Sequence, residues 1–371
     1  MQSKFRLLVV RLSAMGDILH ALPAVAALRQ AHPCWQIGWA VEPRWRPLLA
    51  AASVEVSYSS ARPPDAVCYS TQTPRDPRMP LVDWLHFAPT KAWGHRPLAA
   101  QTFREIRALR DELRNADYDA VLDLQGSIRS AVVGRLSSCP RRLGELTPRE
   151  GPARLLFTEW IATRGAHVAE QDVELASAVA GDALTPAASL LPIDAEAELW
   201  CDGWLAANST SGPARPIALI LPGAGWGAKR WPPERYLSVA QRLRDRGFLV
   251  VVNAGPGEEQ LAAAIAIDGA AAPLTATLPQ LIAFTRRAAL VVGGDTGPLH
   301  LAAALGRPVV GIYGPTDPSR NGPFGTRARI LRSPGSRRDH TRRAAPDPGL
   351  FTIAPDDVLR AAAELLAEEK M

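Results

Sequence analysis

The sequence predicts an α/β protein made of two doubly wound domains with parallel sheets. Short apolar runs typical of buried strands alternate with longer amphipathic segments typical of helices along most of the chain. This alternation restarts after a stretch that contains prolines and a Ser/Thr/Gly-rich linker, residues 186–215. The length of 371 residues, of which 47% are apolar, also suits two hydrophobic cores better than one.

The first domain is expected to cover residues 1–185. Its strands are predicted from short apolar runs and its helices from apolar residues at helical spacing. Strands are expected at residues 5–11, 35–41, 84–87 and 120–124. Helices are expected from residue 18 to about 32 and at 98–115, 127–137 and 168–179. Pro23 predicts a kink or a late start in the first helix, and residues 42–97 and 147–165 show little regular pattern.

The second domain is expected to cover residues 216–350, after a linker that holds one short helix, residues 195–206. Its strands are predicted at residues 217–221, 248–253, 289–292 and 309–313. Its helices are predicted at residues 233–246, 258–267, 278–287 and 297–305, with a terminal helix at 355–369. Ligands of such sheets bind beyond the carboxyl ends of the strands, so we expect the two domains to face a cleft.

The composition narrows the class of protein. Lys and Arg number 42 and Asp and Glu 37, so the formal net charge is +5, which favours phosphates, nucleic acid or anionic lipid head groups as partners. A surface that simply uses arginine as its ordinary cation explains the total charge equally well. A nucleic-acid role rests on charge alone, because no motif of interleaved aromatic and basic residues supports it.

The spacing of the cysteines and the lengths of the hydrophobic runs indicate the cellular compartment in which the protein is expected. The four cysteines are scattered without a C-x-x-C pair, so neither a zinc site nor a disulfide framework is indicated, and reduced thiols are expected. The first apolar run covers only residues 7–10, which is too short for a signal peptide. No run approaches the ~20 apolar residues that span a bilayer. We expect a cytoplasmic protein whose contact with a membrane is peripheral.

The first segment with chemical potential is Arg11-Leu-Ser-Ala-Met-Gly-Asp17, between the first strand and the first helix. Gly16 permits a close backbone approach or a positive φ, and Asp17 stands at the helix entrance. A purely structural role, in which Asp17 caps the free N–H groups of the helix, is an equally direct interpretation. The segment is not G-x-G-x-x-G, so a nicotinamide site is poorly supported.

The second segment is Pro222-Gly-Ala-Gly-Trp-Gly-Ala-Lys-Arg-Trp-Pro232, after the first strand of the second domain. Three glycines followed by Lys229 and Arg230 form a loop whose amides and cations suit a diphosphate. The segment lacks G-K-[ST], so it is not a Walker A loop. A flexible turn with solvated cations is the alternative.

The third segment is Gly293-Gly-Asp-Thr-Gly-Pro-Leu-His300, at another strand-to-helix turn. Thr296 and Gly297 present a hydroxyl and amides at a helix N-terminus, which favours an anion. Asp295 would repel that anion, so we assign it to sugar or ribose hydroxyls. His300 follows Thr296 by one helical turn and is either a ligand-facing or a structural residue. The turn at residues 314–318 is either a further part of the site or a simple turn.

Together these segments resemble glycosyltransferase family 9, the ADP-heptose:lipopolysaccharide heptosyltransferases. The matching stretches occur in the order of the family and span nearly the whole chain: Ser13-Ala-Met-Gly-Asp-Ile-Leu-His20, Tyr118-Asp-Ala-Val-Leu-Asp-Leu-Gln-Gly126, Lys229-Arg-Trp-Pro232, Gly294-Asp-Thr-Gly-Pro-Leu-His300 and Tyr313-Gly-Pro-Thr-Asp317. The first domain looks most like the enzyme that adds the first heptose. The loop at residues 222–232 looks closer to the enzyme that adds the second.

The resemblance implies a GT-B architecture, in which two Rossmann-like domains bind the acceptor and the sugar nucleotide respectively. It implies an inverting, metal-independent transfer of a heptose from an ADP-sugar to the inner core of lipopolysaccharide, on a Kdo-lipid A type of acceptor. No cofactor or metal is expected, since no D-x-D motif is placed to hold a metal–diphosphate. In this family the terminal helix returns to the first domain, which predicts that residues 355–369 pack there.

The resemblance also assigns roles to individual residues. Asp17 is expected to be the general base that takes the proton of the acceptor hydroxyl, and Lys229 to neutralise the leaving diphosphate. The residues expected to contact the donor are Lys229, Glu258 (or its neighbour Glu259), Asp295, Thr296, Gly297 and His300. Those expected to contact the acceptor are Ser13, Gly16, Arg62 and Arg142, with further arginines of the first domain as candidates: Arg75, Arg78, Arg96, Arg104, Arg141 and Arg149.

Other functions are compatible with the same two-domain plan. One is an isomerase of the sugar-nucleotide 2-epimerase type, which changes the donor sugar in the absence of an acceptor. Another is a glycosyltransferase of the same family that uses a different donor or a different cell-surface glycan. A third is a binding protein without catalysis, which the complete set of donor-loop motifs argues against.

Overall fold

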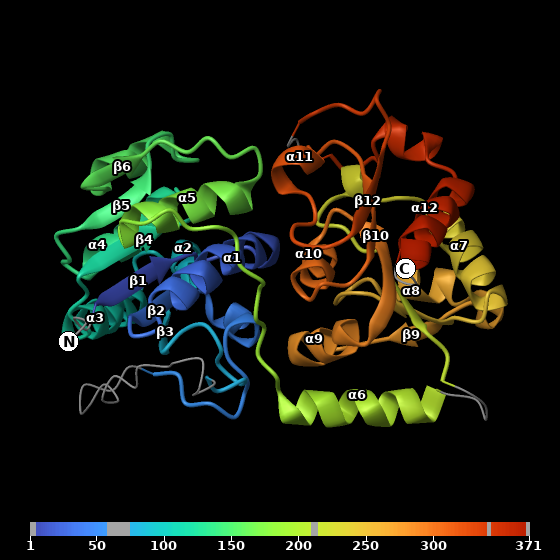
Figure 1. Ribbon diagram of the computed structural model, residues 1–371, viewed down its shortest axis with the longest axis horizontal. Coiled ribbons are helices and arrows are strands. Elements are labelled where there is room, and N and C mark those ends of the chain that lie inside the picture. The colour runs from blue at the N-terminus through green and yellow to red at the C-terminus, as the bar shows by residue number, and fades with distance from the viewer. Residues whose placement is uncertain (1–4, 58–74, 209–213, 340–342, 369–371) are drawn as a thin grey trace. The chain divides into compact units, whose positions relative to one another are not determined.

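The computed structural model describes residues 5–57, 75–208, 214–339 and 343–368. The chain forms two compact units, Met1–Ile193 and Asp194–Met371. The boundary between them falls inside the predicted linker. Each unit contains one six-stranded sheet in which every pairing is parallel, so the predicted α/β class with two doubly wound sheets is confirmed (Figure 1).

The sheet of the N-terminal unit has the strand order β3-β2-β1-β4-β5-β6. Its strands are β1 (Arg6–Val10), β2 (Gln36–Val41), β3 (Trp84–Phe87), β4 (Ala120–Asp123), β5 (Arg142–Glu145) and β6 (Glu159–Ile161). The central strands β1, β2 and β4 are buried along almost their whole length, as expected for parallel strands covered on both faces. The strand order reverses at β1 and β4, and in such sheets a ligand binds beyond the carboxyl ends at this point.

Helices cover both faces of this sheet (Figure 1). On one face α1 (Met15–Ala31) packs closely on α5 (Val168–Ala180). On the other face α3 (Ala100–Asn115) and α4 (Ile128–Leu136) share a core with the strands. A shorter helix α2 (Thr90–His95) precedes α3, and two 3-10 helices follow β2 and β5: η1 (Pro43–Leu48) and η2 (Gly151–Leu156). Pro23 lies within α1, which begins at Met15, so the late start is not observed.

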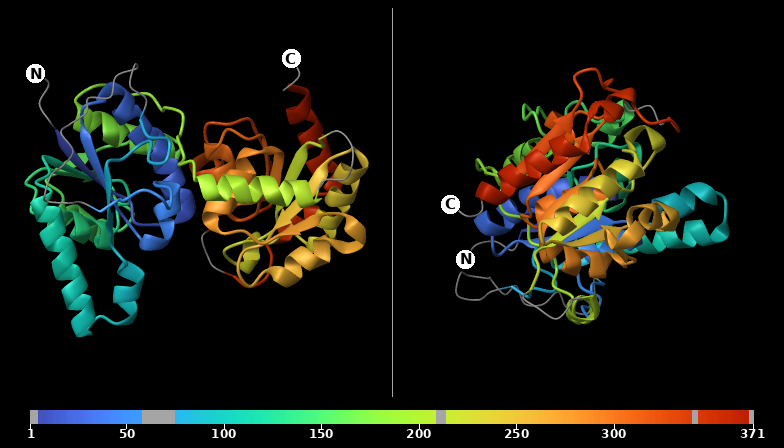
Figure 2. Two further views of the ribbon diagram at one scale, coloured as in Figure 1. Left: turned by 90° about the horizontal axis from the view of Figure 1, so that it is seen from below. Right: turned by 90° about the vertical axis from the view of Figure 1, so that its right-hand side faces the viewer.

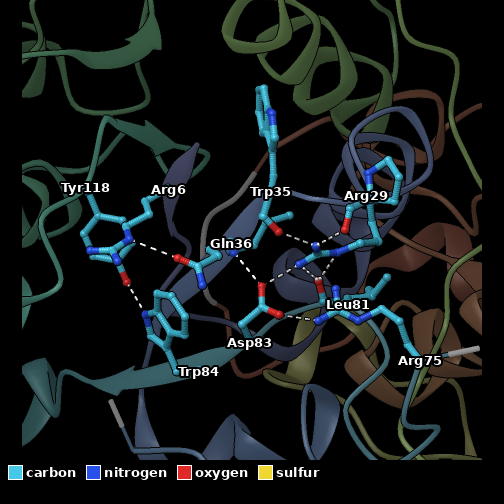
Figure 3. Close-up of polar contacts among 11 residues, drawn as sticks. Arg6, Arg29, Trp35, Gln36, Arg75, Leu81, Asp83, Trp84 and Tyr118 are labelled. Atoms are coloured by element: carbon cyan, nitrogen blue, oxygen red, sulfur yellow. Dashed lines mark hydrogen bonds and ion pairs between the residues drawn. The ribbon is translucent and has the colours of Figure 1, made fainter. Parts of the chain in front are cut away.

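A charged cluster at the amino edge of the sheet fixes the far end of α1 (Figure 3). The carboxylate of Asp83, just before β3, pairs with Arg29 of α1 at 2.8 Å and also with Arg75. The same carboxylate accepts the backbone N–H of Ile37 at 2.7 Å, and Arg29 donates to the carbonyl of Leu81. Arg75, one of the candidate acceptor arginines, is therefore used here within the fold.

The sheet of the C-terminal unit has the strand order β12-β11-β10-β7-β8-β9. Its strands are β7 (Ile217–Leu221), β8 (Leu249–Asn253), β9 (Ala272–Leu274), β10 (Ala288–Gly294), β11 (Val309–Tyr313) and β12 (Ala328–Arg332). The central strands β7, β8, β10 and β11 are buried apolar runs. Their carboxyl ends lead into the segments that the sequence singled out, at residues 222–232, 294–297 and 314–318.

The helices of this unit also lie in two layers (Figure 1). α7 (Pro233–Asp245), α8 (Glu259–Ile265) and α12 (Pro355–Glu368) share one core cluster with the strands. α9 (Leu278–Arg286) and α10 (Gly297–Ala304) pack together elsewhere on the sheet, and α6 (Ala195–Asn208) lies along α9 (Figure 2). Short elements complete the unit: η3 (Gly227–Lys229), η4 (Ile267–Gly269), α11 (Pro318–Asn321) and η5 (Pro348–Thr352).

The terminal helix is packed within its own unit. α12 packs on α7, β11 and β12 of its own unit. The reason is its apolar stripe: Val358, Leu359 and Leu365 are buried in the same cluster as Val292 and Val310 of the sheet. A contact of this helix with the first domain stays a prediction.

Two further structural findings bear on the expectations from composition. Cys139 and Cys201 are free and buried, but Cys34 is disulfide-bonded, so the expectation of reduced thiols fails for Cys34. Within the described ranges no helix combines the length and the apolar character that a membrane span requires.

Candidate functional site

The first polar segment lies at the carboxyl end of β1. Asp17 is the third residue of α1, and its Oδ2 accepts the backbone N–H of Ala14 at 3.0 Å. Its Oδ1 lies 3.6 Å from Nη2 of Arg11, and the side chain is 38% exposed. One carboxylate oxygen of Asp17 therefore caps the start of the helix, as the structural interpretation expected. The carboxylate is nevertheless accessible enough to reach a ligand, and the two interpretations of Asp17 are compatible.

Behind Asp17 the unit buries several charged groups. Arg11 is only 6% exposed, and its Nε has no hydrogen-bond partner among the described residues. Asp123, the last residue of β4, is 3% exposed. Burial raises its pKa to about 6, although hydrogen bonds from Gly126, Gln125 and Ser130 act to lower it. These groups lie at the same sheet edge as Asp17, because β1 and β4 are parallel neighbours.

Asp172 of α5 is a second buried acid, and sequence reasoning missed it. It is 2% exposed, and its Oδ2 has no hydrogen-bond partner within the described part of the chain. Burial raises its pKa to about 7; Arg11 counteracts this, while Asp17 and other nearby acids add to it. A signal existed in the sequence, because Asp172 falls on the apolar stripe of α5 between Ala169 and Ala176.

The predicted acceptor residues do not all come together. Ser13 belongs to the segment between β1 and α1, and Gly16 lies in the first turn of α1 with no positive φ. Arg142 is the first residue of β5, at the amino edge, where it donates to the carbonyls of Leu156 and Cys139 at 2.8 and 2.5 Å. The structure therefore does not bring Arg142 to the edge that carries Asp17. Arg62 lies outside the described residues.

Several of the other candidate arginines are engaged in ion pairs within the fold: Arg78 with Asp76, Arg96 with Glu105, and Arg141 with Glu159. Arg149 differs from them. It is exposed, and its backbone N lies about 3.0 Å from the Cβ position of Gly126, in the loop that follows β4. Among the described candidates, Arg149 thus lies at the carboxyl edge beside the loop that follows β4.

In the C-terminal unit the site is centred on Lys229, at the end of η3. Lys229 is 8% exposed, and its Nζ forms an ion pair with Oδ2 of Asp295. The other oxygen of Asp295 lies 3.2 Å from Nε2 of His300. Burial acts to raise the pKa of Asp295, but the hydrogen bond from His300 and the charge of Lys229 outweigh it and hold that pKa well below its usual range.

This arrangement changes the interpretation of Asp295. We expected a carboxylate beside a phosphate seat to repel the ligand unless it bound hydroxyls. The structure shows that its charge is instead compensated, because Lys229 and His300 occupy its two oxygens. The same contacts explain why His300 follows Asp295 closely in sequence: the first turn of α10 returns the imidazole to the strand end.

The loop around Lys229 is packed tightly from behind. The indole of Trp226 lies 4.0 Å from Nζ of Lys229, in a cation–π contact. A Cβ on Gly227 would come within 1.6 Å of the carbonyl oxygen of Ala344, so only glycine fits there. Ala228 donates to the carbonyl of Arg343 at 3.0 Å. These contacts fix the position of Lys229 before any ligand arrives.

Other polar groups at this edge are ready for a ligand. Thr296 is the N-cap of α10, which begins at Gly297, and its Oγ1 is buried without a hydrogen-bond partner among the described residues, like Oγ1 of Thr316. Buried hydroxyls normally have hydrogen-bond partners, so these two are available to bond with a ligand. Glu258 lies over Gly223, where a Cβ would approach its carboxylate to 2.3 Å, and accepts the N–H of Gly255 at 3.0 Å.

The predicted donor residues thus lie at one edge of one sheet, after β7, β8 and β10. Among the residues that the structure describes, no three His, Cys, Asp or Glu side chains gather in a way that would hold a metal ion. The chemistry available here is that of a buried cation, backbone amides and hydroxyls. This set suits a diphosphate with an attached sugar.

Comparison with known proteins supports this interpretation. Residues 106–347 match the model of the family described as "Glycosyltransferase family 9 (heptosyltransferase)". Lipopolysaccharide heptosyltransferase 1 of Escherichia coli O18:K1:H7 is 29% identical over 343 residues, 89% of this chain and 92% of the relative. Lipopolysaccharide heptosyltransferase 2 of Salmonella typhimurium is 30% identical over 285 residues, 71% of this chain and 80% of the relative.

A solved structure is similar over nearly the whole chain. The structure titled "E. coli heptosyltransferase WaaC with ADP" superimposes with a TM-score of 0.74 at 26% identity and covers 97% of this chain and 100% of its own. The likeness therefore includes both units.

The buried Asp172 makes the stability of the protein depend on pH. Between the pKa of an unfolded aspartate, about 3.9, and the raised value of about 7, the folded state keeps a proton that the unfolded state releases. This contribution to stability is complete below about pH 4 and is lost as the pH rises to about 7. Asp172→Asn removes this dependence, so the variant should gain stability relative to the wild type across this window, by roughly 4 kcal/mol at its upper end.

Chemical denaturation of both proteins from pH 4 to pH 8 measures the difference. The exposed Asp182, just beyond the end of α5, provides the control. Asp182→Asn should follow the wild type at every pH. A constant difference between Asp172→Asn and the wild type would show that Asp172 is ionised throughout.

Proposed function

The chain belongs to glycosyltransferase family 9 (heptosyltransferase), and we propose that it transfers a heptose from an ADP-sugar to the inner core of lipopolysaccharide, with inversion at the anomeric carbon and without a metal ion. The observation that carries the proposal is the buried Lys229 with its partners Asp295 and His300, at the strand edge where a sugar nucleotide binds in such sheets. The names of the relatives, lipopolysaccharide heptosyltransferases 1 and 2, support the same sugar and acceptor class.

In this proposal the C-terminal unit binds the donor. Lys229 contacts the diphosphate, whose remaining oxygens accept hydrogen bonds from the amides at the start of α10 and from the unpartnered Oγ1 of Thr296. Glu258, which lies beyond the ends of β7 and β8, accepts hydrogen bonds from the ribose hydroxyls. The solved relative that contains ADP supports an adenine nucleotide as the leaving group.

The N-terminal unit supplies the base and the acceptor contacts. The hydroxyl oxygen of the acceptor attacks the anomeric carbon while the bond from that carbon to the diphosphate oxygen breaks. ADP leaves with the electron pair of that bond, and Asp17 takes the proton of the hydroxyl. A carboxylate suffices as base when the proton is released late, in an oxocarbenium-like transition state. Lys229 stabilises the charge that grows on the leaving oxygen, in place of a metal ion.

The acceptor is anionic, and exposed arginines of the N-terminal unit suit it. Arg149, at the carboxyl edge beside Gly126, is the best placed of them to contact a carboxylate or phosphate. Because the acceptor carries a lipid anchor, we propose that the enzyme works in peripheral contact with the cytoplasmic face of the inner membrane. No described feature favours nucleic acid as a partner. The family assignment favours transfer over sugar-nucleotide epimerisation.

The donor class is tested with a panel of ADP-, UDP- and GDP-sugars, each offered with and without a Kdo-lipid A acceptor and in the presence of a chelator. ADP-heptose should raise the unfolding temperature most, and should release ADP rapidly only when the acceptor is present. Conversion of the donor sugar without an acceptor would instead identify an epimerase. Preference for a UDP- or GDP-sugar would refute the proposed donor.

Replacement of Asp17 tests the base. Asp17→Asn keeps an oxygen that can accept the Ala14 N–H, so the helix start should be preserved while the proton acceptor is lost. We expect turnover to fall by roughly 10²- to 10⁴-fold, with little change in the dissociation constant for ADP-heptose. Asp17→Ala, which also removes the cap, should lose as much turnover and some stability in addition. Turnover close to that of the wild type in either variant would show that another group is the base.

Replacement of Lys229 should damage both donor affinity and turnover. In Lys229→Ala the carboxylate of Asp295 loses its counter-charge beside the incoming diphosphate, so repulsion is added to the loss of the cation. Adding Asp295→Asn to Lys229→Ala should therefore recover part of the donor affinity. Binding of ADP measured by calorimetry checks this, with Lys91→Ala, an exposed lysine of the other unit, as the control. Unchanged ADP affinity in Lys229→Ala would exclude the proposed contact.

A further inference from the structure

The motif Asp123-Leu-Gln-Gly126 has no part in the proposed binding of the donor or in the proposed proton transfer. It begins with the last residue of β4, the strand next to β1, and continues into the loop that follows. Oδ1 of Asp123 accepts the backbone N–H groups of Gln125 and Gly126, both at 2.8 Å, and the hydroxyl of Ser130 at 3.1 Å. Gly126 has φ +62°, a value that favours glycine. The loop is thus held in one conformation by a buried carboxylate.

This conformation directs the side chain of Gln125 to the neighbouring segment. Oε1 of Gln125 accepts the backbone N–H of Leu12 at 2.7 Å and that of Ser13 at 3.3 Å. Its Nε2 donates to Oγ of Ser127 at 2.8 Å, so the amide group is engaged on both sides and its orientation is set. The two N–H groups belong to the turn that leads from β1 into α1.

The same turn is held from its other side by β2. The carbonyl of Leu12 accepts the N–H of Glu42 at 3.1 Å, and the N–H of Arg11 donates to Ala40 at 3.3 Å. Three residues after Leu12 the helix begins, and Asp17 is its third residue. The place of the Asp17 carboxylate therefore depends on contacts from both neighbouring strands. On the β4 side, Gln125 provides the side-chain hydrogen bonds to this turn.

We propose that Gln125 is a positioning residue for Asp17: by accepting the N–H groups of Leu12 and Ser13 it fixes the turn that sets where the base meets the acceptor hydroxyl. The inference rests on the proposed role of Asp17 as the base. A small displacement of a reacting group lowers the rate steeply, so the effect of Gln125 is on turnover more than on donor affinity. Gln125 itself touches no substrate in this proposal.

The test compares Gln125→Leu, which has a similar size but accepts no hydrogen bond, with Gln125→Glu, which keeps the accepting oxygen. Gln125→Leu should lower kcat by roughly tenfold to a hundredfold with the KM for the donor nearly unchanged. Gln125→Glu should recover most of the lost turnover. Gln101→Leu, the same change on the exposed face of α3, is the matched control and should behave as the wild type.

Two readouts separate positioning from a general loss of structure. Hydrogen exchange of the segment at residues 10–20 should be roughly tenfold faster in Gln125→Leu than in Gln125→Glu. In the Asp17→Asn background, measured in single turnovers, Gln125→Leu should cause little further loss, because the group that it positions is gone.

The outcomes are distinguishable. Unchanged exchange in Gln125→Leu, or losses of turnover that multiply in the double variant, would overturn the role of Gln125 and leave Asp17 as the base. Full turnover of Asp17→Asn would overturn the base itself and the positioning role with it. If Gln125→Leu fails to fold, Gln125→Asn replaces it in the comparison with Gln125→Glu. Asn is too short to reach Leu12, so Gln125→Asn should show the slow turnover and the fast exchange.

Discussion

The site of the C-terminal unit depends on the ion pair between Lys229 and Asp295. Both side chains are more than nine-tenths buried, and neither charge would be tolerated there alone. His300 occupies the second oxygen of Asp295, and Trp226 covers the ammonium group, so the lysine is held on several sides. The tight glycine loop and the start of α10 have the conformations that these contacts require.

The N-terminal unit also buries charged groups next to its candidate site. It buries two acids, Asp123 and Asp172, near the buried cation Arg11, and burial raises the pKa of both acids. One oxygen of Asp123 orders the loop after β4, while Oδ2 of Asp123 and Oδ2 of Asp172 both have no hydrogen-bond partner among the described residues. The accessible Asp17 stands in front of this cluster and shares Arg11 with it. Its surroundings therefore include charged groups that are buried within the unit.

Much of this architecture was predictable from the sequence, and the exceptions have physical reasons. The predicted strands at residues 217–221 and 309–313 match β7 and β11, because strands buried on both faces are continuous apolar runs. The missed strands β5, β6, β9 and β12 lie at or next to sheet edges and are short or only half-buried. Such strands lack the pattern that single-sequence reasoning detects.

The residues of the candidate site were also predictable in part, whereas their partners were not. Lys229, Asp295, Thr296 and His300 were predicted together, because strand-to-helix turns rich in glycine mark the carboxyl edge of a parallel sheet. The partners of these residues were not predictable. That Asp295 binds Lys229, that Gln125 reaches Leu12, and that Arg142 points to the opposite edge are consequences of tertiary packing between segments far apart in the sequence.

The paired state of Lys229 also bears on how this glycosyltransferase would use it. A lysine already neutralised by a carboxylate attracts a ground-state diphosphate less than a free lysine would. Its interaction grows as the bond to the sugar breaks and negative charge accumulates on the leaving oxygen. An interaction that is weak in the ground state and strong in the transition state accelerates the reaction, whereas one that is equally strong in both only tightens binding. In the proposed mechanism, the counter-charge of Asp295 would thus shift the benefit of Lys229 from binding towards turnover.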